Sequence, residues 1–347
     1  MGQLLDNIGL WVEYYWGQIS DWLLHATTPG HKFALAIVVV LLFVAVMSLL
    51  LWLVDRPKRS RSWLVAIAFA GPALLAVTFG LVYPAIRTAQ ASVHDRSGKT
   101  FIGLDNYATV LTNPEFQLVL RNTVVWVFLV PILSTLIGLV YAVLVDRTKF
   151  ERFAKTLVFL PMAISMVGAS IIWKFVYEYR STGSEQVGLL NQVLKSLGLE
   201  TQQFIINAPL NTLFLIVVMV WIQAGFAMTI LSASIKAIPE EIIEAARLDG
   251  LHGFGMFRHI TVPSIRPALV VVLTTIAMGT LKVFDIVRTM AAGGSYQTSV
   301  VANEYYTQTF KFNEKGIGAT LAVVLFILVV PLIVYNVRQM RKVEEIR

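Results

Sequence analysis

Long apolar runs are the feature that most constrains how this chain can fold. A helix needs about 20 apolar residues to cross the ~30 Å hydrocarbon core of a bilayer, and only helices and closed barrels satisfy their backbone hydrogen bonds there. Runs of this kind occur at 33–54, 63–86, 123–145, 157–177, 210–235, 267–290 and 316–337. They predict an all-α, polytopic membrane protein with about seven transmembrane helices.

The composition agrees with a membrane protein and excludes several other classes. Hydrophobic residues make up 56% of the 347 positions and charged residues 14%, whereas soluble domains are nearer to half apolar and a quarter charged. The absence of cysteine excludes disulfides, zinc–thiolate sites, iron–sulfur clusters and thiol catalysis. The net charge of +7 does not indicate a nucleic-acid partner, because that requires basic residues clustered on a soluble face.

The basic residues alternate between the segments that connect the runs, and this predicts an orientation. Lys and Arg number sixteen in 55–62, 146–156, 233–266 and 338–347, but eight in 1–33, 87–118, 178–209 and 291–315. Cytoplasmic segments carry the basic excess, so the C-terminus and the segment 233–266 are expected in the cytoplasm. An odd number of spans then leaves the N-terminus outside the cell membrane.

The first 25 residues have one apolar face and no continuous apolar core. This pattern predicts an amphipathic helix that lies in the membrane interface, rather than a signal peptide, which begins with a basic segment. The apolar face comprises Leu4, Ile8, Trp11, Tyr15, Ile19 and Trp22, and the opposite side carries Asp6, Glu13 and Asp21.

No catalytic or metal-binding constellation stands out in the sequence. The five histidines are scattered, and there is no H-E-x-x-H, nucleophile elbow or carboxylate cluster. Gly98-Lys99-Thr100 resembles the end of a phosphate-binding loop, but Val93 stands where that loop needs a glycine. We therefore expect no enzyme activity, no metal and no cofactor in this chain. If ATP drives its function, another chain hydrolyses it.

The segment 233–266 is long for a connection between helices, and such segments are usually functional or structured. Pro239 followed by acidic residues indicates a helix start, and Gly250 is expected to end that helix. A second short helix is predicted over 254–260, ended by Pro263. A helix–turn–helix of this kind suits docking to a partner protein.

Residues in this segment resemble the signature of the bacterial ABC import permeases. The pattern is Glu244-Ala245-Ala246, then Gly250, Ile260 and Val262-Pro263, with Val262 where leucine is usual. Motifs elsewhere are similar to the carbohydrate-uptake branch of that family, and the resemblance covers about residues 64–340. These motifs are Gly103-Leu104-Asp105-Asn106-Tyr107, Asn122-Thr123, Phe159-Leu160-Pro161, Gly188-Leu189-Leu190-Asn191, Phe284-Asp285 and Gly293-Gly294.

The resemblance implies a six-helix permease core at 63–347, preceded by an N-terminal part at 1–62 that adds one helix and a basic linker. It implies import of a sugar, with a second permease subunit, two ATP-binding subunits that hold ATP and Mg²⁺, and an extracytoplasmic solute-binding protein as partners. The segment 233–266 would dock to the ATP-binding subunit. Its coupling residues would be Glu244, Ala245, Ala246, Asp249, Gly250 and Pro263.

Charged residues within the run 267–290 are the other prominent feature. Lys282, Asp285 and Arg288 would each cost about 2.5–3.5 kcal/mol near the centre of a lone helix. On a continuous helix Asp285 could pair with either base. Two interpretations stay open, a lining for the substrate path and a structural ion pair. Because sugar sites combine aromatic and polar groups, Trp221 and Gln223 join Lys282 and Asp285 as candidate path residues.

Two other function classes are alternatives to an importer permease. A secondary transporter of a small polar solute would usually show repeated halves and broken helices, which the hydropathy pattern does not indicate. A membrane-embedded enzyme would need a catalytic constellation. The resemblance implies a sugar as cargo, an oligosaccharide such as maltose, trehalose or another α-glucoside, and leaves glycerol phosphate open as well.

Overall fold

The computed structural model describes residues 28–55, 62–146, 148–181, 183 and 185–344. The amphipathic helix predicted for the first 25 residues lies outside these ranges. Contacts divide the chain into two compact units, Met1–Ala85 and Ile86–Arg347. The boundary at 62/63 that the family resemblance implies stays a prediction.

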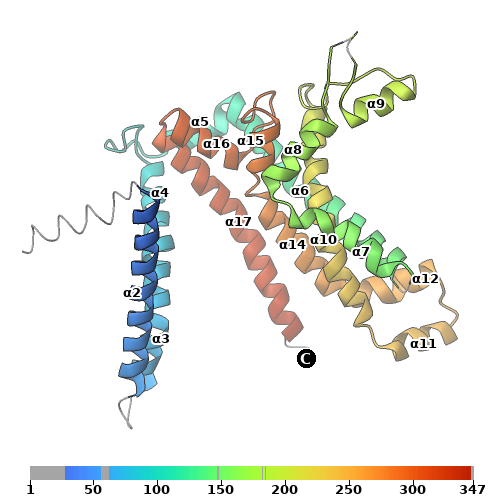
Figure 1. The fold of residues 1–347 in the computed structure, drawn as a ribbon, viewed down its shortest axis with the longest axis horizontal. Helices are drawn as coiled ribbons and strands as arrows, with labels where there is room; N and C mark the ends of the chain where they lie inside the picture. The colour runs from blue at the N-terminus through green and yellow to red at the C-terminus, as the bar shows by residue number, and fades with distance from the viewer. Residues whose placement is uncertain (1–27, 56–61, 147, 182, 184, 345–347) are drawn as a thin grey trace, which may run out of the picture. The chain divides into compact units, whose positions relative to one another are not determined.

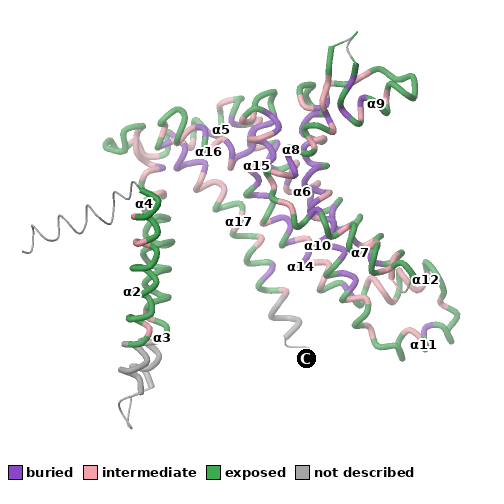
Figure 2. The backbone as a smooth tube through the Cα atoms, viewed as in Figure 1, coloured by how far each residue is buried: buried purple, intermediate pink, exposed green. Residues whose placement is uncertain are grey.

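The first unit consists of apolar helices with little burial. α2 (Pro29–Asp55) contacts α3 (Ser62–Val77). After α3 a π-helical turn, η1 (Thr78–Val82), leads into α4 (Tyr83–Ser92), whose residues from Ile86 onward belong to the second unit. Figure 2 shows the described residues of these helices almost entirely as exposed. Because their exposed side chains are largely apolar, lipid is the environment that these helices fit.

The second unit is built around a tightly packed helix pair. α6 (Pro114–Val145) packs along α10 (Leu210–Lys236). The two approach closely at Gly138, where an added Cβ would lie 2.6 Å from the Cβ of Ala227. Small residues at a contact allow this close packing of membrane helices. The largest fully buried side chains between the helices of this unit include Trp126, Leu215, Met219 and Ile276.

The predicted helix at 157–177 is wrong, because the structure breaks it. α7 (Glu151–Phe159) passes through a 3₁₀ turn, η2 (Leu160–Ala163), and the chain then bends by 105° into α8 (Met166–Val176). Ser165 begins the new helix by accepting a hydrogen bond from the Gly168 N–H at 3.1 Å. Such a cap supplies a partner for a backbone donor that the break leaves free.

The predicted helix at 267–290 is also wrong. α14 (Arg266–Thr280) ends ten residues earlier, and α15 (Asp285–Met290) is a separate helix after a turn. At its other end α14 meets the helical segment Phe254–Ser264 with a bend of 69°. Both bends contradict the expectation from hydropathy that this chain has no broken helices. Within the described residues five helices are long and apolar enough to span a membrane, or up to seven if each bent pair is one span.

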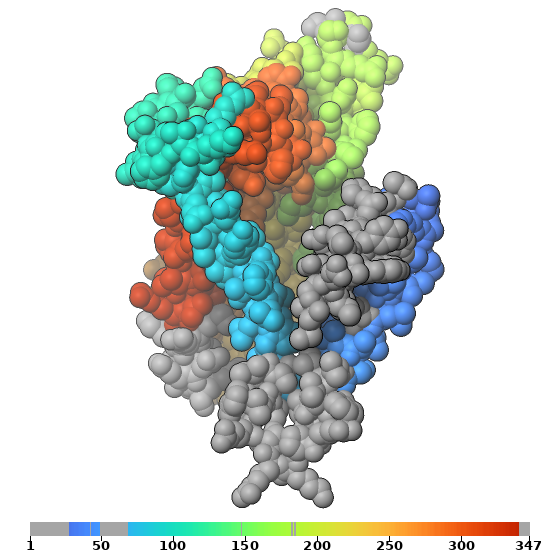
Figure 3. Space-filling view, turned by 90° about the vertical axis from the view of Figure 1, so that its left-hand side faces the viewer, coloured from blue at the N-terminus to red at the C-terminus, as the bar shows by residue number. Residues whose placement is uncertain are grey.

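Short helices lie at both ends of the second unit. Figure 1 shows α11 (Glu240–Leu248) and α12 (Phe254–Met256) at one end and α9 (Leu189–Ser196) at the other. α17 (Lys315–Glu344) packs against α14, α16 (Val301–Tyr306) and α5 (Asp105–Thr112). In Figure 3 the teal atoms around α5 lie beside the orange-red atoms around α16. An ion pair between Arg96 and Glu314 at 3.1 Å ties the same region together.

Candidate coupling loop and substrate groove

The first helix of the predicted coupling loop ends as its sequence indicates. Gly250 follows α11 with φ +84°, and its N–H bonds to the Arg247 carbonyl at 3.0 Å. The N–H of Leu251 bonds to the Ala246 carbonyl at 2.9 Å. These paired bonds form a Schellman motif, which requires a left-handed residue where only glycine is relaxed. The space around an added Cβ is open, so the backbone conformation explains the need for glycine here.

The second helix of the loop is longer than predicted. α12, a π-helical turn η3 (Phe257–Thr261) and α13 (Val262–Ser264) form one helical segment. Pro263 therefore lies inside its last turn and does not end it at residue 260. Ile265 follows at the bend and is buried, which anchors the loop to the helices of the second unit.

The six predicted coupling residues do not all face outward. Ala246 is only 5% exposed and packs within this chain, whereas Glu244, Ala245, Asp249, Gly250 and Pro263 are exposed. Sequence reasoning missed Leu248 and Phe254, which are 89% and 72% exposed. Glu244 and Leu248 are four residues apart and share one face of α11. We call Glu244, Ala245 and Leu248 the coupling face.

A groove of about 410 Å³ contains one of the predicted path residues, Trp221. The Trp221 ring meets the Trp173 ring edge-to-face at 5.7 Å. Tyr141 and Pro161 also line the groove, which brings α6, α8 and α10 together at the bend between α7 and α8. The sequence did not identify Tyr141 and Trp173 as candidate path residues, because apolar runs do not show which aromatic side chains meet once the helices have packed. Gln223 is partly buried and does not line this groove.

Lys282 and Asp285 occupy a different place from Trp221. Lys282 is exposed in the turn after α14, and Asp285 is the first residue of α15. Within the described part of the chain no ion pair joins Asp285 to either base, so the predicted pairing is wrong. It assumed one continuous helix. Arg288 instead lies 4.7 Å from the ring centroid of Tyr306 in a cation–π contact.

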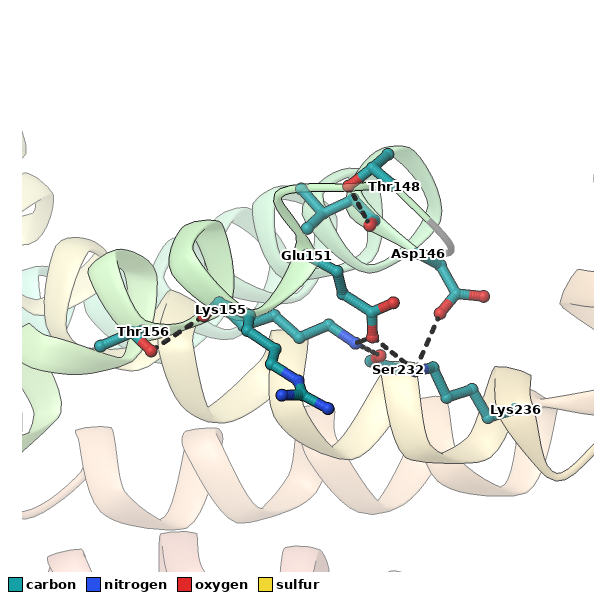
Figure 4. Close-up of polar contacts among 9 residues, drawn as sticks. Asp146, Thr148, Glu151, Lys155, Thr156, Ser232 and Lys236 are labelled. Atoms are coloured by element: carbon teal, nitrogen blue, oxygen red, sulfur yellow. Dashed lines mark hydrogen bonds and ion pairs between the residues drawn. The ribbon is translucent and has the colours of Figure 1, made fainter.

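A cluster of charges connects the end of α10 to α7, as Figure 4 shows. Glu151 accepts hydrogen bonds from both Lys155, at 2.6 Å, and Lys236. Lys236 also lies 3.5 Å from Asp146, and Lys155 donates to Ser232. In the sequence, Lys155 and Lys236 contributed only to the predicted orientation of the chain in the membrane. The cluster joins α7 to α10 four residues before α11 begins.

The fragment that resembles a phosphate-binding loop has a structural explanation. One carboxylate oxygen of Asp95 accepts hydrogen bonds from the N–H groups of Lys99 and Thr100 at 3.1 and 3.2 Å and from the Ser97 hydroxyl at 2.8 Å. The Ser97 hydrogen bond and the backbone bonds lower the pKa of Asp95 to about 2. A carboxylate thus occupies the donors that a phosphate would need. Among the described residues no group of His, Asp and Glu could hold a metal ion.

Comparison with known proteins agrees with these features. Residues 108–342 match the family described as the binding-protein-dependent transport system inner membrane component. The alpha-glucoside transport system permease protein AglF of Rhizobium meliloti (strain 1021) is 48% identical over 80% of this chain and 82% of its own length. The osmoprotective compounds uptake permease protein GgtC of Synechocystis sp. (strain ATCC 27184 / PCC 6803 / Kazusa) is 43% identical over 80% of this chain and its full length.

Two further matches extend the comparison. The trehalose/maltose transport system permease protein MalF of Thermococcus litoralis (strain ATCC 51850 / DSM 5473 / JCM 8560 / NS-C) is 31% identical over 74% of this chain and 87% of its own length. A chain of a bacterial alginate ABC transporter crystal structure has the same fold, with a TM-score of 0.70 at 22% identity over 82% of this chain and 96% of that one. The chain therefore belongs to the binding-protein-dependent transport system inner membrane components, the permease subunits of ABC importers.

Proposed function

We propose that this permease carries an α-glucoside, such as maltose or trehalose, across the membrane. The observation that carries the proposal is the 48% identity to AglF, an alpha-glucoside permease, and the trehalose/maltose permease MalF supports it. GgtC, named for osmoprotective compounds, is 43% identical over its whole length and makes small osmoprotective solutes the second candidate.

Uptake by the complete transporter tests this choice. Proteoliposomes that contain the permeases, the ATP-binding subunits and the binding protein should accumulate radiolabelled maltose, trehalose or sucrose when ATP is inside. Glycine betaine serves as the non-glucoside comparison. Accumulation of betaine without any glucoside would overturn the first candidate in favour of the second.

We also propose that the coupling face docks to a partner subunit that binds ATP and Mg²⁺. The apolar side chain of Leu248 is exposed in the isolated chain and can pack against a partner, and Glu244 on the same face offers a negative charge for a basic partner residue. The complete importer would hold a second permease, two such ATP-binding subunits and an external binding protein. This chain hydrolyses no ATP itself in that arrangement.

The proposed orientation places α11 and the C-terminus in the cytoplasm and α9 outside. The twofold excess of Lys and Arg in the segments on the α11 side supports it. The N-terminus is then external if seven spans are present. The groove around Trp221 would form part of the substrate path. Gln223, Lys282 and Asp285 are proposed as path residues outside this groove.

A further inference from the structure

A strained loop precedes α16 at the end of the second unit that we propose to be external. Ala292, Tyr296 and Gln297 have φ values of 48°, 58° and 63°, in the left-handed region that side chains other than glycine rarely adopt. Gly293 and Gly294 between them also have positive φ. Conformations of this kind persist only where the surroundings impose them, and they cluster at ligand sites.

Buried amides impose this conformation from three different helices. Asn122 of α6 and Asn211 of α10 donate to the carbonyls of Gln297 and Tyr296, each at 2.7 Å. Asn303 of α16 donates to the Gly293 carbonyl at 3.0 Å. The three side chains are at most 4% exposed. These hydrogen bonds therefore hold the loop in its conformation, which is part of the fold.

The loop presents Tyr296 to a pocket of about 260 Å³, which we call the outer pocket. Tyr296 is 44% exposed. Lys174 and Tyr179, at the end of α8 and just beyond it, lie along the same pocket, as do Gln203 and the buried Phe204.

The polar groups of the outer pocket are unengaged within the described chain. The side chains of Lys174, Tyr179, Gln203 and Tyr296 form no hydrogen bond there, although each can donate or accept one. The charged lining residues, Lys174 and Glu178, balance each other. This lining favours a neutral, hydroxyl-bearing ligand over an anionic one.

The size of the outer pocket favours a single sugar ring. Pockets for drug-sized ligands begin at about 300 Å³, so 260 Å³ is too small for a whole oligosaccharide. Aromatic residues offer apolar faces to the C–H groups of a pyranose, and the free donors and acceptors meet its hydroxyls.

The outer pocket also shares a wall with the groove around Trp221. The ring of Trp173 in the groove lies 5.1 Å from the ring of Tyr177, which lies 5.4 Å from the ring of Phe204 in the outer pocket. A ligand in the outer pocket would therefore be close to the proposed path without occupying it.

We propose that the outer pocket is a second carbohydrate subsite, which takes one neutral pyranose ring of the cargo at the external end of the permease. This inference rests on the proposed α-glucoside function and adds to it a binding site separate from the groove.

Protection of an introduced cysteine tests the subsite, because the chain has no cysteine of its own. The complete transporter with Gln203→Cys, in nanodiscs that leave both faces accessible, is labelled with a charged maleimide. Methyl α-D-glucoside should slow this labelling and mannitol should not. Gln202→Cys is the matched control, because Gln202 is exposed and does not line the pocket. Ile206→Cys, also in the lining, repeats the measurement should Gln203→Cys disturb the fold.

A second variant links the protection to Tyr296. Tyr296→Asn removes the aromatic ring but keeps a residue that tolerates positive φ. In the Gln203→Cys background, the glucoside concentration for half-protection should rise about fivefold, the loss expected for one aromatic contact. Equal labelling of Gln203→Cys and Ile206→Cys with and without glucoside, in a complex that still imports α-glucosides, would overturn the subsite alone. Absence of α-glucoside import by the unsubstituted complex would overturn the proposed function, and the subsite with it.

Discussion

The left-handed conformation of Gly250 gives the sharpest test of the coupling loop. Gly250→Ala places a Cβ on a residue with φ +84°, where the surrounding space is open. The cost is therefore conformational, about 1–2 kcal/mol. An undocked loop can relax this strain by fraying the end of α11, whereas a docked α11 cannot. The affinity for the ATP-binding subunit should then fall by a factor of about 5–30.

Two other substitutions in the loop isolate the conformational effect. Gly255→Ala is the matched control, because Gly255 has no positive φ and its added Cβ would lie 3.6 Å from Leu251, an ordinary contact. Gly250→Asn should lose less than Gly250→Ala, since asparagine tolerates the left-handed region. Titration of the purified permease pair with the ATP-binding subunit measures each affinity. Equal losses for Gly250→Ala and Gly255→Ala would refute the reasoning.

The remaining predictions concern packing, the charged turn and orientation. Gly225→Ala should destabilise the fold by about 1–3 kcal/mol through overpacking, because the new Cβ would lie 2.5 Å from the Val158 carbonyl oxygen. Gly279→Ala should not destabilise the fold, because no atom lies within 4 Å of its added Cβ. Thermal unfolding in detergent compares the two variants. Lys282→Met should leave the amount of assembled complex unchanged, because Lys282 forms no ion pair within the described residues. Uptake kinetics should change if Lys282 faces the path. If assembly is lost and the added substitution Asp285→Leu restores it, Lys282 and Asp285 form a structural pair instead. In whole cells, an impermeant thiol reagent should label Ser196→Cys in α9 but not Ser264→Cys in α13, and the reverse would show that the orientation is inverted.

Local chemistry explains which parts of the fold the sequence could predict. Run length and hydropathy decide membrane insertion, so the helices at 123–145 and 210–235 were placed correctly within α6 and α10. The end of α11 was predictable because a Schellman turn depends on one glycine at one position. These features need no knowledge of the neighbouring helices.

The bends and the groove could not be predicted in the same way. Apolar residues continue through Pro161, and the turn after Thr280 keeps Leu281, Val283 and Phe284 beside the charged Lys282. The mean hydropathy of each run therefore stays high enough to hide its break. The ion pair predicted for Asp285 failed for the same reason, because helical spacing was assumed across a turn. Trp173 and Trp221 meet only after α8 folds back at the 105° bend, and single-sequence patterns carry no such information.

Crosslinking from Leu248 tests most directly whether this chain couples to a separate ATPase. Leu248→Cys, 89% exposed on α11, is labelled with a benzophenone maleimide in membranes that contain the whole transporter, and illumination captures its neighbour. Leu199→Cys, 56% exposed near α9, is the control at the other end of the unit. We expect Leu248→Cys, and not Leu199→Cys, to capture a chain that contains a phosphate-binding loop. This crosslink should block ATP-driven uptake by the transporter. Capture of lipid only, or capture of that chain from Leu199→Cys instead, would contradict the coupling role of α11.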